Sequence, residues 1–355
     1  MQSLLAITWD MGRGIDLGFF TIRYYSLLFA LGFVLGYFLM KKMFEKAGVA
    51  QEKLDSLLTY TVIATVVGAR LGHVFFYQWD YYSQHPGEIL KVWEGGLASH
   101  GAAIAIIIAI IIFSRKVLKK SPLWMLDRLV ITIALAAALI RIGNFANSEI
   151  YGDIANSNLE TVYTNPVRER ILVNFGEIFE SVDFTELDKN EITDSIIYPV
   201  YDMQLQVLPG VSKQKAENAI GALKPYLNDR LDREDKNILI SNASIRWDEQ
   251  KKNSVHVEAL GVPRHPTQLY EAFAYFLIFL ILYRLYIMEG VIARNGFIFG
   301  AFLILLFGFR FFIEYYKEVQ VSSEHGQGLL IGQWLSIPLV AIGLYFVVTA
   351  KKEKS

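Results

Sequence analysis

Long apolar runs recur along the chain and predict helices that cross a membrane. A helix needs about 20 mostly apolar residues to span the hydrocarbon core of a bilayer. Seven runs approach that length, at residues 19–40, 57–77, 97–113, 123–145, 270–287, 296–313 and 329–349. The pattern therefore predicts an all-α polytopic membrane protein with seven transmembrane helices.

A long polar segment, richer in acidic than in basic residues, interrupts this pattern between residues 153 and 262. Apolar and polar residues alternate within it at 203–207 and at 255–257, as in half-buried strands, and apolar residues recur at helical spacing over 212–223. We expect this insert to fold as a small α+β domain outside the membrane. The chain then divides into helices one to four (1–152), the insert (153–262) and helices five to seven (263–355).

Basic residues gather in every second connection between the predicted helices, and short connections rich in Lys and Arg stay in the cytoplasm. These connections contain Lys41, Lys42, Lys46, Lys53, Arg115, Lys116, Lys119, Lys120, Arg284, Arg294, Lys351, Lys352 and Lys354. Outside the insert, the alternate connections contain only Arg13, Lys91 and Lys317. The pattern predicts an outer N-terminus, an outer insert and a cytoplasmic C-terminus.

Composition narrows the chemistry. The 34 basic residues nearly cancel the 35 acidic ones, so nothing indicates a nucleic-acid partner. The chain has no cysteine, which excludes disulfides, thiolate metal sites and a cysteine nucleophile of its own. The helices also lack a carboxylate cluster for magnesium and an HExxH zinc pattern. We therefore predict neither a metal nor another cofactor, and any reacting thiol must come from another molecule.

Polar residues cluster at the predicted outer ends of the helices. They are Arg23 and Tyr25 in helix one, His100 in helix three, Arg141, Asn144, Asn147 and Glu149 in helix four, Arg264 and His265 before helix five, and Arg310 and Glu314 in helix six. Polar groups in spans usually face a bundle interior or a water-filled cavity and mark a functional pathway. One shared site near the outer leaflet is the simplest interpretation.

Each residue also has a structural interpretation. An arginine at a helix end can reach the lipid headgroups. Arg310 and Glu314 lie four residues apart on one helix face and could form a self-contained ion pair. His100 is either a structural hydrogen-bonding residue or a base, because histidine has the side-chain pKa best suited to proton transfer near neutral pH. The cluster as a whole favours a site.

Two polar stripes lie deeper in the predicted spans. Arg141, Asn144 and Ser148 share one face of helix four, which must look inward. Arg70 and His73 share a face of helix two, and an arginine at the depth of Arg70 costs about 2.5–3.5 kcal/mol unless it is solvated or paired. We expect Arg70 to point at an anion or a carboxylate. Since arginine binds phosphate through its planar fork, a phospholipid headgroup is the natural ligand at this depth.

Several sequence motifs resemble those of bacterial prolipoprotein diacylglyceryl transferases. They are GARLGHVFFY (68–77), GGLASHGAAIA (95–105), RIGNFANSEIYG (141–152), PRHPTQLYEA (263–272), FRFFIEYYKE (309–318) and GQWLSIP (332–338). The run that begins at Arg141 is the most specific of them, and the motifs cover both halves of the membrane part. The insert is longer than is common in this family, Ser148 and Lys317 stand where glycine and arginine are frequent, and Leu306 replaces an aromatic hydroxyl.

The resemblance implies an enzyme of the bacterial cytoplasmic (inner) membrane. It would transfer the diacylglyceryl group of phosphatidylglycerol to the lipobox cysteine in the signal peptide region of a prolipoprotein and release glycerol phosphate. The expected catalytic residues are Tyr25, His100, Arg310 and Glu314, and the expected substrate-binding residues are Arg70, Arg141, Asn144, Glu149, Arg264 and His265. Either His100 or Glu314 would take the thiol proton, and the insert either selects precursors or has no catalytic part.

Two other functions fit parts of the pattern. An arginine-lined cavity could carry a phosphorylated solute, but a transporter needs polar access from both leaflets, and the cytoplasmic helix ends show only flanking Lys and Arg. An alcohol phosphotransferase acting on phospholipids would need a dense aspartate motif for its metal, which these helices lack.

Overall fold

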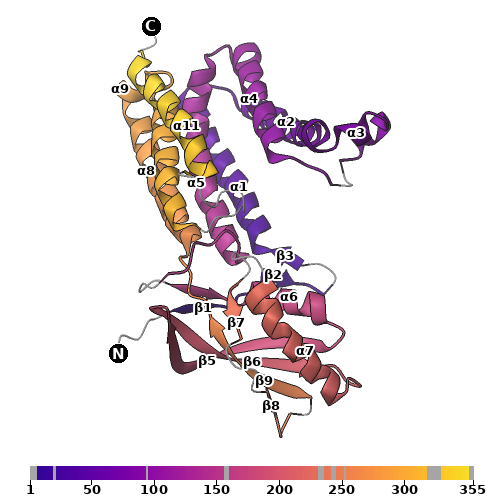
Figure 1. Cartoon of the computed structure of the whole chain (residues 1–355). Helices are drawn as coiled ribbons and strands as arrows, with labels where there is room; N and C mark the ends of the chain where they lie inside the picture. The colour runs from indigo at the N-terminus through magenta and orange to yellow at the C-terminus, as the bar shows by residue number, and fades with distance from the viewer. Residues whose placement is uncertain are drawn as a thin grey trace. The chain divides into compact units, whose positions relative to one another are not determined.

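A computed structural model describes residues 6–18, 21–92, 95–155, 160–230, 236–240, 245–251, 253–317 and 329–351, and Figure 1 traces the chain. It contains seven helices long and apolar enough to cross a membrane, as predicted. They are α1 (Tyr24–Lys46), α2 (Gln51–Tyr77), α4 (Ser99–Phe113), α5 (Pro122–Ala146), α8 (Thr267–Ile287), α10 (Phe297–Ile313) and α11 (Ile331–Thr349). A π-helical turn, η3 (Ser114–Leu118), extends α4, and a 3-10 turn, η6 (Glu314–Tyr316), extends α10.

The first span begins later than its apolar run. Strand β2 (Gly14–Asp16) pairs with β3 (Thr21–Arg23) in an antiparallel hairpin, and α1 starts directly after it. Gly14 permits this pairing, because a Cβ atom there would lie 2.3 Å from the carbonyl oxygen of Ile22. The predicted start of the helix near residue 19 is therefore wrong. Phe19 itself, like Lys352 and Lys354 of the C-terminal basic group, lies outside the described residues.

The insert contains the predicted α+β fold, with an antiparallel sheet in the order β5-β6-β9-β7 and β8 also paired with β9. The strands are β5 (Phe179–Thr193), β6 (Ile196–Val207), β7 (Ile238–Leu239), β8 (Ile245–Trp247) and β9 (Ser254–Gly261), and the helices are α6 (Asn165–Phe175) and α7 (Lys213–Pro225). The alternating apolar residues of β6 and β9 are buried with one face of α7 in a common core. The Ser212 hydroxyl caps α7 by accepting a hydrogen bond from the Lys215 amide, 3.3 Å away.

The segment ahead of the first span also joins the insert. Strand β1 (Ile7–Trp9) pairs in parallel with β4 (Thr161–Tyr163), with Ile7 opposite Thr161. Residues at the start of the chain thus contribute a strand to the extramembrane part. The proposed division of the chain at residues 152 and 262 remains a prediction.

The chain contains two compact units. The first unit comprises Met1–Leu31, Ala137–Tyr275 and Phe307–Pro338, and the second comprises Gly32–Ala136, Phe276–Leu306 and Leu339–Ser355. Short elements complete them: α3 (Trp79–Tyr82), η1 (Pro86–Leu90), η4 (Tyr226–Arg230) and α9 (Glu289–Ile292).

Within the second unit, glycines and a buried carboxylate fix the helices. A Cβ atom on Gly72 of α2 would lie 2.7 Å from the Gly101 Cα of α4, so these helices meet backbone to backbone. Asp127 of α5 accepts hydrogen bonds from the amides of Gly296 and Phe299, at 2.6 and 2.8 Å. This carboxylate therefore caps the beginning of α10.

Candidate functional site

The end of α5 folds back on itself. Ser148 and Ile150 adopt the left-handed conformation, with φ of 55° and 58°, and the Glu149 amide donates to the Asn144 carbonyl at 3.1 Å. The Asn144 side-chain amide then donates to the Glu149 carboxylate at 2.8 Å, and that of Asn147 does so at 3.4 Å. A left-handed position favours glycine, which explains why a glycine would also suit position 148.

Gly152 brings three distant parts of the first unit together. Its amide donates to the His265 carbonyl at 2.8 Å, and it forms a β-bridge with Lys317. A Cβ atom at this position would lie 2.5 Å from the Tyr316 carbonyl oxygen. Only glycine allows this approach, which places the end of α5 beside the start of α8 and the end of η6.

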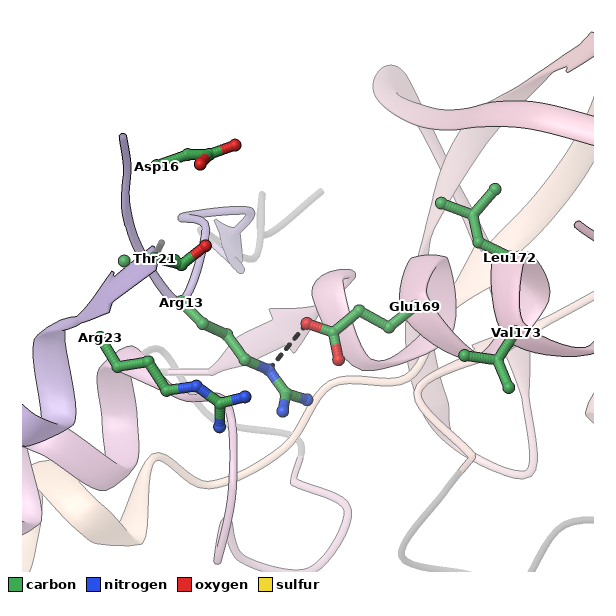
Figure 2. Close-up of a pocket in the computed structure, with 8 residues that line it drawn as sticks. Arg13, Asp16, Thr21, Arg23, Glu169, Leu172 and Val173 are labelled. Carbon is green, nitrogen blue, oxygen red and sulfur yellow. Dashed lines mark ion pairs between the residues drawn. The ribbon is translucent and has the colours of Figure 1, made fainter. Parts of the chain in front are cut away.

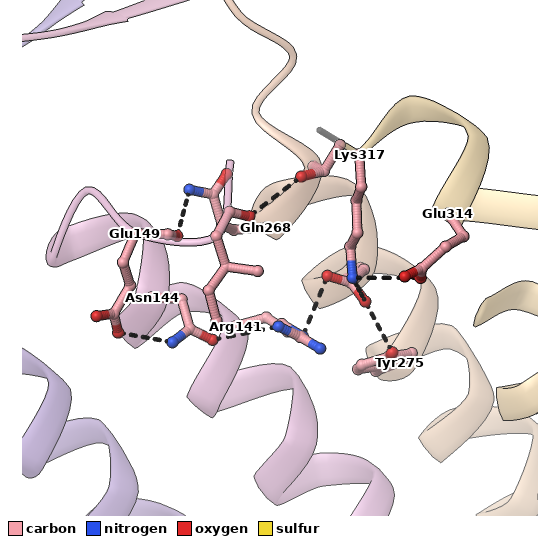
Figure 3. Close-up of polar contacts among 10 residues, drawn as sticks. Arg141, Asn144, Glu149, Gln268, Tyr275, Glu314 and Lys317 are labelled. Carbon is pink, nitrogen blue, oxygen red and sulfur yellow. Dashed lines mark hydrogen bonds and ion pairs between the residues drawn. The ribbon is translucent and has the colours of Figure 1, made fainter. Parts of the chain in front are cut away.

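The Glu271 carboxylate is the centre of the resulting polar network. Its side chain is fully buried, and Oε1 accepts hydrogen bonds from the Tyr275 hydroxyl at 3.0 Å and from Lys317 Nζ at 3.2 Å. Oε2 lies 3.2 Å from Arg141 Nε as an ion pair. Figure 3 shows Arg141, Tyr275 and Lys317 reaching toward one point from α5, α8 and the residue after η6.

Arg141 lies between this carboxylate and the turn that ends α5. Arg141 Nη1 donates a weak hydrogen bond to Asn144 Oδ1 at 3.5 Å, and the Arg141 side chain is 14% exposed. Within the described part of the chain, its other terminal nitrogen, Nη2, has no hydrogen-bond partner. Arg141 is therefore held in place by Glu271 and Asn144 with donors to spare for an anion.

Lys317 connects the centre of the network to Glu314. Its Nζ lies 3.9 Å from Glu314 Oε2, and burial lowers the pKa of Lys317 while the Glu271 charge opposes this shift. Gly332 lies against the Glu314 carboxylate, since a Cβ atom there would come within 2.4 Å of Oε1. Its lack of a side chain leaves room for this carboxylate beside α11.

The self-contained ion pair that was the structural alternative for Arg310 and Glu314 is not present among the described residues. Helix α10 ends at Ile313, and Glu314 begins a 3-10 turn, so the regular four-residue spacing is lost. Glu314 pairs with Lys317 instead. The Tyr275 ring lies 6.2 Å from the ring of Phe309, the residue before Arg310, so α8 and the end of α10 are neighbours in the first unit.

Tyr25 and His265 lie at the edges of this region. The Tyr25 ring packs on α5 at Gly143, where a Cβ atom would lie 3.0 Å from Tyr25 Cδ2. His265 Nδ1 lies 3.4 Å from the Tyr270 hydroxyl. Burial lowers the pKa of His265, and the neighbouring Asp153 opposes this shift.

Arg264 contacts backbone carbonyls and an aromatic ring inside the first unit. Its side chain is fully buried, and its guanidinium donates to the carbonyls of Gly152 and Lys236 at 3.2 and 2.9 Å. The guanidinium also lies over the Tyr151 ring, 4.9 Å from its centroid. These contacts join the end of α5 to the insert.

Arg70 and His100 belong to the second unit. No carboxylate faces Arg70 among the described residues: its guanidinium donates to the carbonyls of Glu88, Ile89 and Gly95 at 2.7–2.8 Å, and its contact with an anion stays a prediction. The loop after α2 supplies these acceptors, which its sequence does not reveal. The exposed His100 ring packs on Phe76, with centroids 5.0 Å apart.

Sequence reasoning missed Glu271 and two of its neighbours as site residues. Gln268, Glu271 and Tyr275 follow one another at helical spacing, so they share one face of α8. Gln268 donates to the Glu149 carbonyl at 2.8 Å and supports the same turn. A buried polar stripe at the start of an apolar helix was the signal that would have identified them.

Comparisons with known proteins agree over nearly the whole chain. The sequence model of the family "Prolipoprotein diacylglyceryl transferase" matches residues 14–349. A phosphatidylglycerol–prolipoprotein diacylglyceryl transferase of Tolumonas auensis is 35% identical, with 96% of each chain covered. Proteins of the same description from Porphyromonas gingivalis and Chloroherpeton thalassium are 34% and 33% identical, covering 98% and 99% of this chain and 95% and 97% of theirs.

Proposed function

We propose residue roles from the premise that this chain belongs to the prolipoprotein diacylglyceryl transferase family. The protein is a multi-pass membrane transferase. It transfers the diacylglyceryl group of phosphatidylglycerol to the lipobox cysteine of a prolipoprotein and releases glycerol phosphate, the first step of lipoprotein modification.

The reaction forms a bond between the cysteine sulfur and a glycerol carbon and breaks the bond from that carbon to the phosphate oxygen. The thiolate is the nucleophile, so the thiol must lose its proton before or during attack. The phosphate leaves with the bonding electrons, and negative charge on it must be stabilised. A site for this reaction needs fixed cations at the phosphate and a group that accepts the thiol proton.

Arg141 binds the phosphatidylglycerol phosphate in this proposal. The observation that carries the proposal is the buried network in which Glu271 and Asn144 hold the Arg141 guanidinium while Nη2 remains available. Glu271 and Lys317 act as positioning residues, because both touch the network and neither is exposed. Asn144 and Glu149 keep the turn after α5 in shape.

Arg310 and Glu314 act on the chemical step. Arg310 has no ion pair with a described residue, so its charge is available to stabilise the departing phosphate. Glu314, paired with Lys317 at 3.9 Å, is the candidate of the first unit for accepting the thiol proton, and His100 of the second unit stays the alternative predicted from the sequence. Tyr25 would line the site beside α5.

His265 would bind substrate at the edge of the site. Arg264 and Arg70 instead have structural roles in this proposal, because their guanidinium groups are directed to backbone carbonyls.

The partners follow from the family, and the orientation follows from the charge pattern. The acceptor is the signal peptide region of a precursor, which brings the lipobox cysteine, and the donor is a lipid of the same bilayer. We infer an outer N-terminus, a cytoplasmic C-terminus and an active site toward the outer leaflet of the bacterial inner membrane, because Lys and Arg concentrate in the opposite connections.

A transfer assay tests the activity. Membranes with the protein are incubated with phosphatidylglycerol and a lipobox peptide, with metals chelated. We expect a mass gain on the peptide cysteine equal to one diacylglyceryl group, and an unmodified peptide would contradict the activity.

A second experiment tests the division of roles. Arg141→Ala should weaken phosphatidylglycerol binding, whereas Arg310→Ala should slow single-turnover transfer at saturating lipid. Equal lipid affinity and equal residual turnover in the two variants would contradict these separate roles.

A further inference from the structure

A pocket lined by two arginines opens between the β2–β3 hairpin and helix α6 in the first unit. Its volume is about 660 Å³, and none of its residues belongs to the Glu271 network. Arg13 and Arg23 line it from the hairpin, and Glu169, Leu172 and Val173 line it from α6. In Figure 2 both arginine side chains run from the hairpin toward α6.

The pocket is held open by contacts outside its lining. The Thr164 hydroxyl donates to the Asp10 carboxylate, and the Asn165 side-chain amide donates to the Met11 carbonyl. Arg168 Nη2 lies 2.7 Å from Asp10 Oδ1. These bonds tie the chain just before the hairpin to the first turns of α6, so the walls are preorganised for a ligand.

The pocket lining carries two arginines and two carboxylates, and the two arginines differ in their partners. Arg13 Nε lies 2.8 Å from Glu169 Oε1, but the Arg23 guanidinium has no ion pair or hydrogen bond with any residue in the described ranges. The remaining acidic residue, Asp16, is engaged in the hairpin turn, where Oδ1 accepts from the Gly18 amide at 2.8 Å. The formal charges of the lining cancel, so the unpaired Arg23 guanidinium is the group that remains available to an anion.

An apolar edge lies directly beside these charges. Leu172 and Val173 follow Glu169 by three and four residues, so they share its face of α6. Val173 is 82% exposed, although α6 lies outside the spanning helices. A phosphate alone would leave this edge uncovered, whereas a phospholipid presents a phosphate next to its ester-linked chains.

Chain connectivity places the pocket at the membrane boundary. Arg23 directly precedes Tyr24, the first residue of spanning helix α1. The hairpin therefore lies at the level where a headgroup meets the hydrocarbon of the bilayer.

We propose that this pocket is an accessory binding site for the phosphate headgroup of a phospholipid, separate from the lipid that reacts at the Glu271 network. Arg23 and Arg13 bind the phosphate through their planar forks. Leu172 and Val173 contact the glycerol and the first methylenes of the chains. The site depends on the membrane location of α1 and not on the residue roles proposed for the transfer reaction.

Lipid titration of the full-length protein in detergent, followed by native mass spectrometry with phosphatidylglycerol as the probe, tests this site. The Arg141→Ala variant serves as the parent, because the reacting site is weakened in it. Adding Arg23→Gln together with Arg13→Gln should weaken the remaining lipid binding about tenfold or more, since hydrogen bonds to charged groups are lost. Arg246→Gln, at an exposed arginine of β8, is the matched control and should leave binding unchanged.

A second variant keeps the test independent of the hairpin. Val173→Asp adds a carboxylate at the exposed edge and should also weaken lipid binding, with the fold intact. Unchanged lipid affinity in both the double arginine variant and Val173→Asp would overturn the proposal.

Competing ligands have their own arms. If inorganic phosphate binds as tightly as the lipid, and its binding also depends on Arg13 and Arg23, the lipid assignment is overturned. The assignment is also overturned if the two substitutions weaken binding of a peptide with the residues that follow the lipobox cysteine but leave lipid binding unchanged. Transfer activity is measured in parallel on the unsubstituted protein. Its absence would contradict the proposed function and leave the binding result standing.

Discussion

Arg141 in the first unit and Arg70 in the second are both arginines inside helices that cross the membrane, but their partners differ. Arg70 is 3% exposed and donates to a ring of backbone carbonyls from the loop after α2. Arg141 is paired with the Glu271 carboxylate, bonds weakly to one amide oxygen and retains an open nitrogen.

This difference separates an arginine that holds a loop from one that can hold a ligand. Carbonyl dipoles satisfy the donors of Arg70 and close the end of α2 around it. A single carboxylate orients Arg141, while Lys317 supplies a second cation to the same carboxylate. Since Glu314 also faces Lys317, the charges of this network are balanced, and the open nitrogen of Arg141 is the feature that suits an added phosphate.

The largest effect should come from Arg141→Ala. We expect transfer to the lipobox peptide to fall by about 10² to 10³, because a fixed donor to the phosphate is lost. Arg141→Lys should restore only part of the rate, since lysine lacks the planar fork. Near-normal transfer by the alanine variant, measured as peptide mass gain, would remove Arg141 from the site.

The next largest effect should be a loss of folding stability when the Glu271 carboxylate is removed from the network. Glu271→Gln leaves Arg141 and Lys317 buried without their counter-charge, which costs about 3–5 kcal/mol when one partner of a buried pair is removed. Thermal unfolding in detergent measures the loss. Glu258→Gln, which breaks the exposed pair with Lys189, is the control and should cost less than about 1 kcal/mol. Equal unfolding temperatures for both variants would show that Glu271 is not essential to the network.

Arg70→Lys should act on stability and not on lipid affinity. A lysine cannot reach all the carbonyls that Arg70 satisfies, and each buried acceptor left alone costs about 1–3 kcal/mol. We expect a lower unfolding temperature with an unchanged KM for phosphatidylglycerol. Arg115→Lys, at an exposed position of the second unit, is the control. A raised KM with unchanged stability would instead place Arg70 at the substrate.

The smallest effect concerns the pH dependence of stability and the Glu160 carboxyl, whose pKa is shifted by burial, whereas Glu271 is paired with two cations. Burial raises the pKa of Glu160 from 4.5 to about 7. Because the folded state holds this proton more tightly, its contribution to stability is complete below about pH 4.5 and is lost as the pH rises through about 7. Glu160→Gln should flatten this part of the stability profile, measured by unfolding between pH 4.5 and 8. Exposed Glu180→Gln should keep the slope, and an unaltered slope in Glu160→Gln would contradict the assignment.

Much of the fold was predictable, because the spans depend on long apolar runs and the strands of the insert on local alternation. The alternation at 203–207 and 255–257 gave β6 and β9 correctly, and the pattern over 212–223 gave α7. The start of α1 was not predictable in this way, since residues 21–23 are apolar enough for a helix but pair with β2. Hydrophobicity alone does not show whether a segment pairs with another strand.

The site was only partly predictable. Arg141, Asn144 and Glu149 were found because they are costly in a span and close in sequence, and the structure does bring them together. Glu271 was missed because its pairing with Arg141 crosses the whole insert, and no spacing rule links such positions. The carbonyl partners of Arg70 were missed for a related reason, since backbone acceptors in a loop leave no signature in side-chain chemistry.

The bridge that Gly152 makes to His265 and Lys317 has a consequence for biogenesis. A ribosome completes α5, with Arg141, before it reaches the codons for α8 and η6. The nascent arginine must therefore enter the translocon without the glutamate that later neutralises it. Closing the site is a late event of synthesis, and a chain halted after its fourth span would carry the arginine with no means of orienting it.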